Sequence, residues 1–518
     1  MKELSTELHL CQRPMFRAGD GSWHTGFWEA VQHSGDSLTW DAAAVMSVIS
    51  FDYIIGDMTL FREVTRQPWL SRIGGDGTPV LSDIPPHGRL WNSHLEIAKT
   101  LGGLLYEEAR RACAGRREIY VTLSGGLDSR IVAATAARLY RDGHLECKPV
   151  CVTWGLENSR DVVYARLTAD FLGLDWIHVN IGPGNLLENI DICIDHGGLF
   201  SPWDYHRMSW FKNVSSDALV LAGSYGDQIG RAVFRGRHNL ELDFLAPSNR
   251  FALLRPDACA RAHEDTKLQL AELRARAPGE PKYVICEHEG LAHYMRSMIA
   301  QAMSSIGEYC DIYQMFTDPN VYSYMWSIHP SLRNDNVYAH LLELLDERIA
   351  RIPWSHTNRA LRGRTVGARK DLNKEFHSYP QWICGPLYED LCNIIDPGWF
   401  AGTGLFDAAA VERLKAGIRG YEGRTPDGLR PYHVWLWLAG FRGLAERLCG
   451  MGKKAGFEAG AAPQFHDTCM HGKNPSVWLK RLGGRSAAAR NAKRKVKLYM
   501  LKRQAVKEHP PLETEEVK

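Results

Sequence analysis

Several features of membrane, secreted and zinc-binding proteins are missing from this 518-residue sequence. No apolar run approaches 18 residues, which excludes a membrane-spanning helix. The first residues, MKELSTELHLCQRP, contain no apolar stretch of the kind that a secretory signal needs, so we expect a cytoplasmic protein. The 12 cysteines form no C-x-x-C pair and have no histidine partners, so we expect reduced thiols and no zinc site. Internal repeats are also absent.

A strong charge imbalance is missing too, although the charges are unevenly distributed. The formal net charge is +2, but residues 480–507 contain 11 Lys or Arg and no Asp or Glu, so the rest of the chain carries −9. Such a basic tail is typical of a solvated segment that is partly helical or disordered. Alternatively, it binds an acidic partner, a membrane surface or RNA by electrostatic attraction. The length suits two or three domains, and 45% hydrophobic and 24% charged residues are ordinary for globular proteins.

The most informative segment is IYVTLSGGLDSRIVAA, residues 119–134. A β-branched run leads into a short turn with two glycines, and a run without Gly or Pro follows, which predicts a strand, a tight loop and the start of a helix. Such a junction directs unpaired backbone amides and the positive end of a helix dipole at an anion, most often phosphate. The loop lacks the Lys of G-x-x-x-x-G-K-[ST] and the spacing of G-x-G-x-x-G, which excludes a Walker A loop and a dinucleotide fingerprint.

The residue types in this loop suit a polyphosphate. Gly125 and Gly126 let the backbone approach the phosphates, and Ser124 and Ser129 offer hydroxyl groups to phosphate oxygens. Asp128 would repel a bare polyphosphate, so we expect a cation between them. Mg²⁺ is the default, because it is usually held by one or two carboxylates together with phosphate oxygens.

The S-G-G-L-D-S sequence resembles the pyrophosphate loop of the ATP pyrophosphatases, and its L-D-S-R ending looks most like the asparagine synthetase branch. A second stretch, DALVLAGSYGDQIG at residues 217–230, resembles the S-G-E-G-A-D-E-L of the same branch. Asp227 matches the metal-binding Asp of that motif, although an Asp here is also typical of a helix N-cap or a turn. Ser224 stands where the family has a Glu linked to amine transfer, and where β-lactam synthetases have a Tyr; here the Tyr follows one position later, at Tyr225.

The resemblance implies ATP and Mg²⁺ as cofactors. Asp128 and Asp227 would hold the metal and act in catalysis. By this resemblance the residues that bind ATP are Leu123, Ser124, Gly125, Gly126, Leu127, Asp128, Ser129, Thr153, Trp154, Gly155, Gly223, Ser224, Tyr225 and Gly226. Residues 153–155 among them would line the adenine. Asp161 either matches an Asp of the family motif D-E-x-x-Y-A or is an ordinary acidic residue in the first turn of a helix.

The segments around the two loops alternate between strand and helix. Residues 148–155 and 176–180 predict strands, and a helix is expected between them, so the rhythm β-α-β-α-β indicates a parallel sheet with crossover helices. Nucleotide then binds at the carboxyl ends of the strands. We therefore expect an α/β fold of the adenine nucleotide α-hydrolase type, with a mainly helical C-terminal half and a small β-rich N-terminal remnant.

The resemblance also suggests the domain boundaries. Residues 1–94 would be a degenerate remnant of a glutaminase-type domain, residues 95–450 the synthetase domain and residues 451–518 a basic tail. The family's glutaminase uses the Cys directly after the start Met as its nucleophile, whereas Lys2 stands there in this chain. Residues 51–61 and 69–73 look like the closing hairpins of that domain.

Two further positions bear on catalysis. Glu308 and Asp318 match the family motif S-x-x-x-E-x-R-x-P-F-L-D, which makes Glu308 either a candidate base for the amine or an ordinary helix-surface Glu. The Lys with which the family steadies the departing pyrophosphate is replaced by Pro353. Lys370 and Lys374 are the replacements that the sequence offers.

These observations predict an amide ligase that forms AMP and pyrophosphate. A carboxylate on a small molecule or peptide would attack the α-phosphorus of ATP, and ammonia or an amine would then attack the acyl carbon. A macrolactam or lactam cyclase of the lasso-peptide or β-lactam type, amidation of a sugar acid, and a non-catalytic nucleotide-binding scaffold stay open as alternatives. An RNA-modifying pyrophosphatase is disfavoured, because a catalytic Cys pair is missing and the second Asp motif is present. As partners we expect a carboxylate, an amine or ammonia and a separate amidotransferase or pathway enzyme, with no membrane span, no nucleic acid and no particular oligomeric state indicated.

Overall fold

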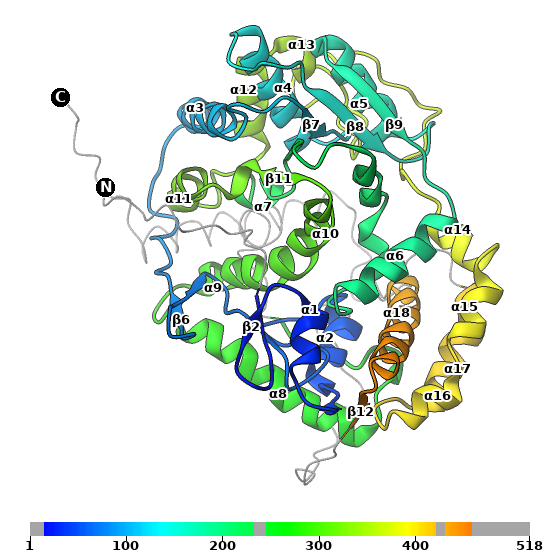
Figure 1. The fold of residues 1–518 in the computed structure, drawn as a ribbon. Coiled ribbons are helices and arrows are strands. Elements are labelled where there is room, and N and C mark those ends of the chain that lie inside the picture. Colours follow the sequence, from blue (N-terminus) through cyan, green and yellow to red (C-terminus); the bar gives the residue numbers. More distant parts are fainter. Residues whose placement is uncertain (1–14, 233–244, 421–429, 458–518) are drawn as a thin grey trace, which may run out of the picture.

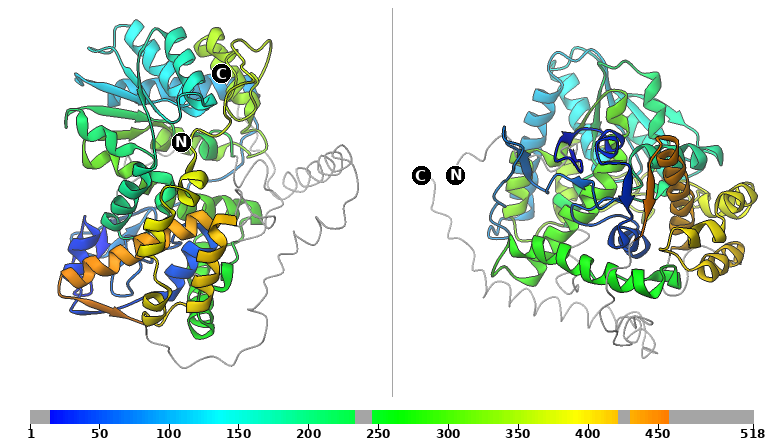
Figure 2. Two further views of the ribbon diagram at one scale, coloured as in Figure 1. Left: turned by 90° about the vertical axis from the view of Figure 1, so that its right-hand side faces the viewer. Right: turned by 60° about the horizontal axis from the view of Figure 1, so that its bottom comes forward.

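The computed structural model describes residues 15–232, 245–420 and 430–457. Seen from the side, a sheet with its helices forms one part of the molecule, and a mainly helical part lies beneath it (Figure 2). The first part holds the segments that the sequence singles out, so it is described first.

A five-stranded sheet forms the centre of the upper part, in the order β11-β10-β7-β8-β9, and every neighbouring pair is parallel (Figure 1). Its strands are β7 (Ile119–Thr122), β8 (Val150–Trp154), β9 (Asp175–Val179), β10 (Leu219–Ala222) and β11 (Asp311–Gln314). The expected α/β fold with a parallel sheet and flanking helices is therefore confirmed. Apolar or β-branched runs at residues 119–122, 148–155, 176–180 and 218–222 predict the first four of these strands, and β11 at the edge is an addition.

Side chains alternate between the two faces of the sheet, as the period of two in a β-strand requires. Ile119, Val121 and Leu221 lie in one apolar core, whereas Tyr120 and Val220 lie in the other. Because both faces are covered, the strands read as continuous apolar runs.

Helices from both halves of the sequence cover the sheet. The core that contains Val121 also contains residues of α3 (His94–Ala112), α4 (Asp128–Arg141), α5 (Arg160–Leu172), α11 (Pro319–Ser327) and α12 (Asp335–Leu345). The core that contains Tyr120 includes residues of α6 (Gly184–Asp195), of the 3₁₀ helices η1 (Pro202–Tyr205) and η2 (Met208–Asn213), and of α10 (Gln301–Ser304). The short helices α7 (Gly226–Ile229) and α13 (Glu347–Ala350) follow at the carboxyl side of β10 and after α12.

The lower part is mainly helical, as expected for the C-terminal half. Its helices are α8 (Pro256–Ala275), α9 (Lys282–Glu289), the π-helical η4 (Gly290–Ala300), α14 (Tyr379–Cys384), α15 (Tyr388–Ile394), α16 (Pro397–Gly402), α17 (Ala408–Gly417) and α18 (Pro431–Gly450). No helix among residues 15–232, 245–420 and 430–457 is both long and apolar enough to cross a membrane.

The N-terminal segment packs into this lower part. It contains α1 (Phe27–Gln32), α2 (Ala42–Phe51) and a small antiparallel sheet of β1 (Phe16–Arg17), β2 (Trp23–His24) and β4 (Thr65–Arg66). Helix α2 lies against α8 (Figure 1). Strand β3 (Ser37–Thr39) pairs in parallel with β12 (Lys454–Gly456), which ties the two ends of the described chain together.

Of the two hairpins predicted in the N-terminal segment, one is present and the other prediction is wrong. Strands β5 (Ser71–Ile73) and β6 (Pro79–Leu81) do form an antiparallel hairpin. Residues 51–61, in contrast, comprise the end of α2 and a loop, because the preceding run AAAVMSVIS is a helix that is buried on all sides. The basic run at residues 480–507 lies outside the described residues.

Candidate active site

Three loops that were predicted to bind ATP meet at one edge of the sheet. Residues 124–129 follow β7, Gly155 follows β8 and residues 223–226 follow β10. These strands are neighbours or next neighbours in a parallel sheet, so their carboxyl ends lie together. From β7 the chain proceeds to β8 and β9 on one side, and it then returns to place β10 on the other side of β7. Ligands of open α/β sheets bind at such a reversal of strand order, at the carboxyl ends of the strands.

The loop at residues 124–129 is organised by its own hydroxyl groups. The Ser124 amide donates to Ser129 Oγ over 3.0 Å, and the Gly126 amide donates to Ser124 Oγ over 3.1 Å. The amides of Leu127, Asp128 and Ser129, at the start of α4, have no acceptor among the described residues. They lie at the positive end of a 14-residue helix, which is the arrangement that binds phosphate.

A buried arginine holds this loop against a distant segment. The Arg130 guanidinium donates to the carbonyl oxygens of Ile349, Ile352 and Pro353 and to that of Gly125, over 2.9–3.2 Å. Burial lowers the pKa of Arg130 to about 10, so the side chain stays charged at neutral pH. The loop therefore has a fixed position before any ligand binds.

Asp161, in the first turn of α5, holds the loop from its other side. Its Oδ1 accepts a hydrogen bond from the Gly125 amide over 3.1 Å. Burial raises the pKa of Asp161 to about 6, although hydrogen bonds from Ser355 and Gly125 lower it. A β-carbon at position 125 would lie 2.8 Å from Ser355 Cβ and 3.0 Å from Asp161 Cα, so only glycine fits this contact.

The second loop packs directly on the first through its glycines. A β-carbon at position 223 would lie 2.9 Å from the backbone carbon of Asp128, and one at position 226 would lie 2.4 Å from Asp128 Oδ1. This approach brings the carboxyl groups of Asp128 and Asp227 into one corner. Burial and the neighbouring Asp128 raise the pKa of Asp227.

These two carboxyl groups fit a divalent cation. Asp128 Oδ1 and Asp227 Oδ1 are both inaccessible to solvent and have no hydrogen-bond partner among the described residues. Buried carboxylate oxygens without partners are costly, and a hard cation that prefers oxygen ligands satisfies them. Among the described residues no three acidic, His or Cys side chains are placed to hold a metal ion together, so further ligands of such a cation would include phosphate or water.

The sequence surrounding both loops matches a known family. Residues 100–298 match the asparagine synthase family model. Residues 100–298 form an asparagine synthase domain. The domain contains both loops, and its family comprises ATP-dependent enzymes that form amides and typically use Mg²⁺.

Two asparagine synthetases resemble the chain over a short stretch. A probable glutamine-hydrolysing asparagine synthetase of Acanthamoeba polyphaga mimivirus is 36% identical over 84 residues, which is 16% of this chain and 14% of that protein. The glutamine-hydrolysing asparagine synthetase of Gallus gallus is 36% identical over 80 residues, 15% of this chain and 14% of that protein. The matched stretch thus spans about a seventh of each relative.

The end of β8, which was predicted to line the adenine, has aromatic surroundings. Thr153 is buried and donates from Oγ1 to the Leu123 carbonyl over 2.7 Å, so its hydroxyl ties β8 to the first loop. The half-buried Trp154 ring stacks on His206, with 6.5 Å between the ring centroids. Gly155 has a φ of +145°, which favours glycine, and a β-carbon there would lie 3.2 Å from Phe376 Cβ.

The wall beyond Trp154 contains residues that the sequence did not indicate. His206 packs edge-on against Phe376, and its Nδ1 shares a hydrogen bond of 3.1 Å with the Tyr379 hydroxyl. Burial lowers the pKa of His206 to about 3, so its ring is neutral and suited to stacking at physiological pH. No local pattern marks His206 or Phe376, because they approach Trp154 from segments 50 or more residues away.

Two residues of the second loop differ in their surroundings. Ser224 is half-buried. Tyr225 is buried among the apolar side chains of the core, and its hydroxyl donates to the Met295 carbonyl over 3.2 Å. Only the backbone of Tyr225 is therefore available to a ligand at this edge.

The structure does not bring Glu308 to this edge. Glu308 ends the 3₁₀ helix η5 (Ile306–Glu308), just before Asp311, the first residue of β11. Asp311 pairs with Leu219, the first residue of β10, so this region lies at the amino end of the sheet. The Glu308 carboxylate instead contacts His196 Nε2 over 2.7 Å, and it lies beyond the matched residues 100–298.

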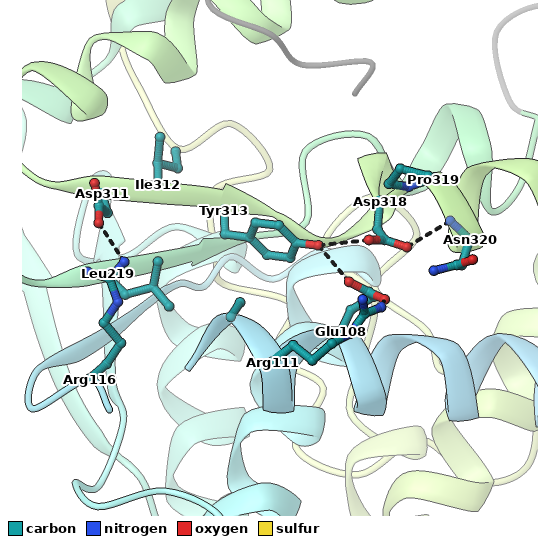
Figure 3. A pocket seen from close by; sticks show the side chains of 11 residues that line it. Glu108, Arg111, Arg116, Leu219, Asp311, Ile312, Tyr313, Asp318, Pro319 and Asn320 are labelled. Atoms are coloured by element: carbon teal, nitrogen blue, oxygen red, sulfur yellow. Dashed lines mark hydrogen bonds and ion pairs between the residues drawn. The ribbon is translucent and has the colours of Figure 1, made fainter. Parts of the chain in front are cut away.

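A cavity of about 450 Å³ lies between β11 and α3, away from the three loops (Figure 3). Inside it the Tyr313 hydroxyl lies 3.0 Å from Glu108 Oε2 and 3.3 Å from Asp318 Oδ2. Asp318 also caps α11 by accepting from the Asn320 amide over 2.8 Å. Asp318 therefore has a structural role at the start of a helix, and the residues predicted to bind ATP do not line this cavity.

Proposed function

We propose that the chain is an ATP-dependent amide ligase that releases AMP and pyrophosphate. One observation carries the proposal: the unpaired amides of residues 127–129 and the unpartnered carboxylate oxygens of Asp128 and Asp227 lie at the same edge of the sheet. Amide donors and a carboxylate pair together suit a triphosphate with its Mg²⁺. The asparagine synthase domain supports the choice of amide formation among ATP-consuming reactions.

In the first step a substrate carboxylate oxygen attacks the α-phosphorus of ATP. A bond forms from that oxygen to phosphorus, the bond from phosphorus to the bridging oxygen breaks, and its electron pair leaves with pyrophosphate. The amides of residues 127–129 hold the leaving pyrophosphate, because they are already directed at it and need no reorganisation. Bound Mg²⁺ supplies charge neutralisation, and Asp128 and Asp227 are the residues that would hold it.

In the second step an amine nitrogen attacks the acyl carbon. The bond from that carbon to the phosphate oxygen breaks, AMP leaves with the electron pair, and the nitrogen gives up a proton to solvent. Neutral His206 and the Trp154 ring provide an apolar wall for adenine and exclude water from that side. The segment at residues 15–92 contains no cysteine, so a cysteine-dependent release of ammonia from glutamine has no nucleophile there. We infer that nitrogen arrives as ammonia from a separate protein, or as an amine of a substrate.

The test is exchange of labelled pyrophosphate into ATP by the full chain. A panel of amino acids, sugar acids and peptides is offered as carboxylate donors, without amine and with Mg²⁺. Exchange that depends on one class of carboxylate, and that is lost in Asp128→Asn, supports the ligase. Addition of an amine should then convert exchange into net AMP release; AMP release without any added amine indicates that the amine belongs to the same molecule. Tight ATP binding with no exchange for any donor would overturn the ligase in favour of a nucleotide-binding scaffold.

A further inference from the structure

A buried arginine occupies the corner that contains Asp128 and Asp227. Arg231 follows α7 and Gly230, and only 5% of its side chain is exposed. Its NH2 atom lies 3.2 Å from Asp128 Oδ2, and its NH1 atom lies 3.3 Å from Asp335 Oδ1 at the start of α12. Its Nε atom is inaccessible and has no partner among the described residues. Each terminal nitrogen has a second N–H beyond the one used in these contacts, so the guanidinium group lies beside the phosphate loop with donors left for a further ligand.

Two aromatic rings fix the guanidinium group in this position. Its central carbon lies 5.1 Å from the centroid of Tyr338 and 5.2 Å from that of Trp354. Tyr338 in turn donates from its hydroxyl to the Gly226 carbonyl over 2.8 Å. A β-carbon at position 230 would lie 2.3 Å from the same hydroxyl, so the chain before Arg231 also packs closely on Tyr338.

Arg231 thus reaches the segment that supports the phosphate loop. Trp354 lies between Pro353, whose carbonyl accepts from Arg130, and Ser355, whose amide donates to the Gly125 carbonyl over 3.1 Å. The family resemblance places its pyrophosphate-steadying Lys at position 353, where this chain has proline. A positive charge from a different part of the sequence therefore lies against the ring of the neighbouring Trp354.

The two lysines that the sequence offers as replacements lie elsewhere. Lys370 and Lys374 are exposed, and Lys374 Nζ lies 3.9 Å from Glu375 Oε1. An exposed ammonium group is strongly hydrated, and it contributes little to a buried anion site. Arg231, in contrast, is already desolvated and held in one orientation.

We propose that Arg231 binds the pyrophosphate part of ATP and stabilises the charge that develops there as the bond to the α-phosphorus breaks. Arginine suits this role because its planar group donates two parallel hydrogen bonds to phosphate oxygens and always stays charged. No proton is transferred: the electron pair of the broken bond stays on the pyrophosphate oxygen, and Arg231 acts through charge and hydrogen bonds. The inference rests on the proposed function, since it assigns a residue to the same reaction.

The test compares ligands that contain the pyrophosphate group with one that lacks it. Binding of Mg²⁺–pyrophosphate, Mg²⁺–ATP and AMP to the full chain is measured by calorimetry for the natural chain, Arg231→Met and Arg231→Lys. For Arg231→Met we expect the dissociation constants of pyrophosphate and ATP to rise by about 10- to 100-fold, and that of AMP to change by less than about threefold. Arg231→Lys keeps the charge but loses the paired geometry, so we expect a loss of about 3- to 10-fold. Asp335→Asn is the control, because it removes a negative charge beside Arg231, keeps an oxygen that can accept from the guanidinium, and leaves Asp128 in place.

The outcomes separate this inference from the proposed function. Unchanged pyrophosphate binding in Arg231→Met, or an equal loss of pyrophosphate and AMP binding, would overturn the role of Arg231. Failure of the natural chain to bind ATP or pyrophosphate would overturn the proposed function itself. If Arg231→Met does not fold, as judged by circular dichroism, Arg231→Lys decides: natural affinity for pyrophosphate together with natural affinity for AMP would contradict the paired geometry.

Discussion

Gly226 lies so close to Asp128 that a β-carbon at position 226 would be 2.4 Å from Asp128 Oδ1 and 2.8 Å from its Cγ. The two residues are 98 positions apart in the sequence, yet this contact joins the loop after β7 to the loop after β10. It also sets how closely the carboxyl groups of Asp128 and Asp227 approach each other. The proposed metal site therefore requires a residue without a β-carbon at position 226.

Gly226→Ala should separate the two loops. Asp128 is held by Arg231 and cannot turn away freely, so the added methyl group must displace Asp128 or α7. We expect the affinity for Mg²⁺–ATP to fall by about 10- to 100-fold, as is usual when a metal ligand loses its position. The measurement is calorimetry with Mg²⁺–ATP. Gly184→Ala is the matched control, because a β-carbon at the start of α6 meets nothing within 4 Å and should leave the affinity unchanged.

Asp227→Asn should make the chain more stable at alkaline pH. The pKa of Asp227 is raised by burial and by Asp128, so the folded state binds its proton more tightly than the unfolded state does. Stability then falls as the pH rises from the unfolded pKa, near 3.9, through the folded pKa, and the amide avoids that loss. We expect a gain of about 1–2 kcal/mol near pH 8.5 that fades toward about pH 4.

The measurement for Asp227→Asn is the melting temperature across this pH range in the presence of a chelator. Asp170→Asn serves as the control, since that carboxylate is exposed on α5. A gain of equal size at every pH would contradict the electrostatic origin. Added Mg²⁺–ATP should stabilise the natural chain and not Asp227→Asn.

Much of the upper part of the fold follows from local sequence patterns. β-Branched and apolar runs predicted β7 to β10. Apolar residues at helical spacing from Leu95 to Ala112 predict a helix, and α3 begins one residue earlier, at His94. Strand β11, DIYQ, contains one β-branched residue and pairs only with β10, so it has little of the pattern of a central strand. Residues 42–51 are a helix without a polar face, which is why the hydrophobic pattern near residue 51 was misread as a hairpin.

The candidate site also contains residues that the sequence predicted and residues that it did not. The loop at residues 124–129 and Asp227 were predicted, because short motifs of Gly, Ser and Asp determine their backbone shape and charge. Arg231 and the carbonyl contacts of Arg130 were missed, since they join residues more than 100 positions apart and no local spacing records such contacts. Glu308 was placed by motif similarity alone, and the pairing of Asp311 with Leu219 puts it at the opposite end of the strands.

Glu308→Gln should leave pyrophosphate exchange unchanged within about twofold, because Glu308 lies away from the three loops. The substitution weakens the contact with His196, so a small loss of stability of about 0.5–1.5 kcal/mol is expected. Exchange kinetics and denaturant unfolding of the same preparation separate these effects. A loss of exchange comparable with that of Asp128→Asn, in a chain of natural stability, would restore Glu308 as a catalytic base.

Gly125→Ala and Gly126→Ala should distinguish the effect of the loop on stability from its effect on ligand binding. A β-carbon at position 125 meets Ser355 Cβ at 2.8 Å and the Asp161 backbone at 3.0 Å, whereas one at position 126 meets only Ser124 Oγ, at 3.0 Å, and that hydroxyl can rotate. Gly125→Ala should therefore lower the free energy of unfolding by about 1–3 kcal/mol, while Gly126→Ala should change it by less than about 1 kcal/mol. Both should weaken pyrophosphate binding, Gly125→Ala by shifting the loop and Gly126→Ala by blocking the approach of phosphate to the backbone. Denaturant unfolding and calorimetry with Mg²⁺–pyrophosphate measure the two effects. If Gly126→Ala binds pyrophosphate as the natural chain does, the phosphate does not lie against this loop, and the anion site must be placed elsewhere along the edge of the sheet.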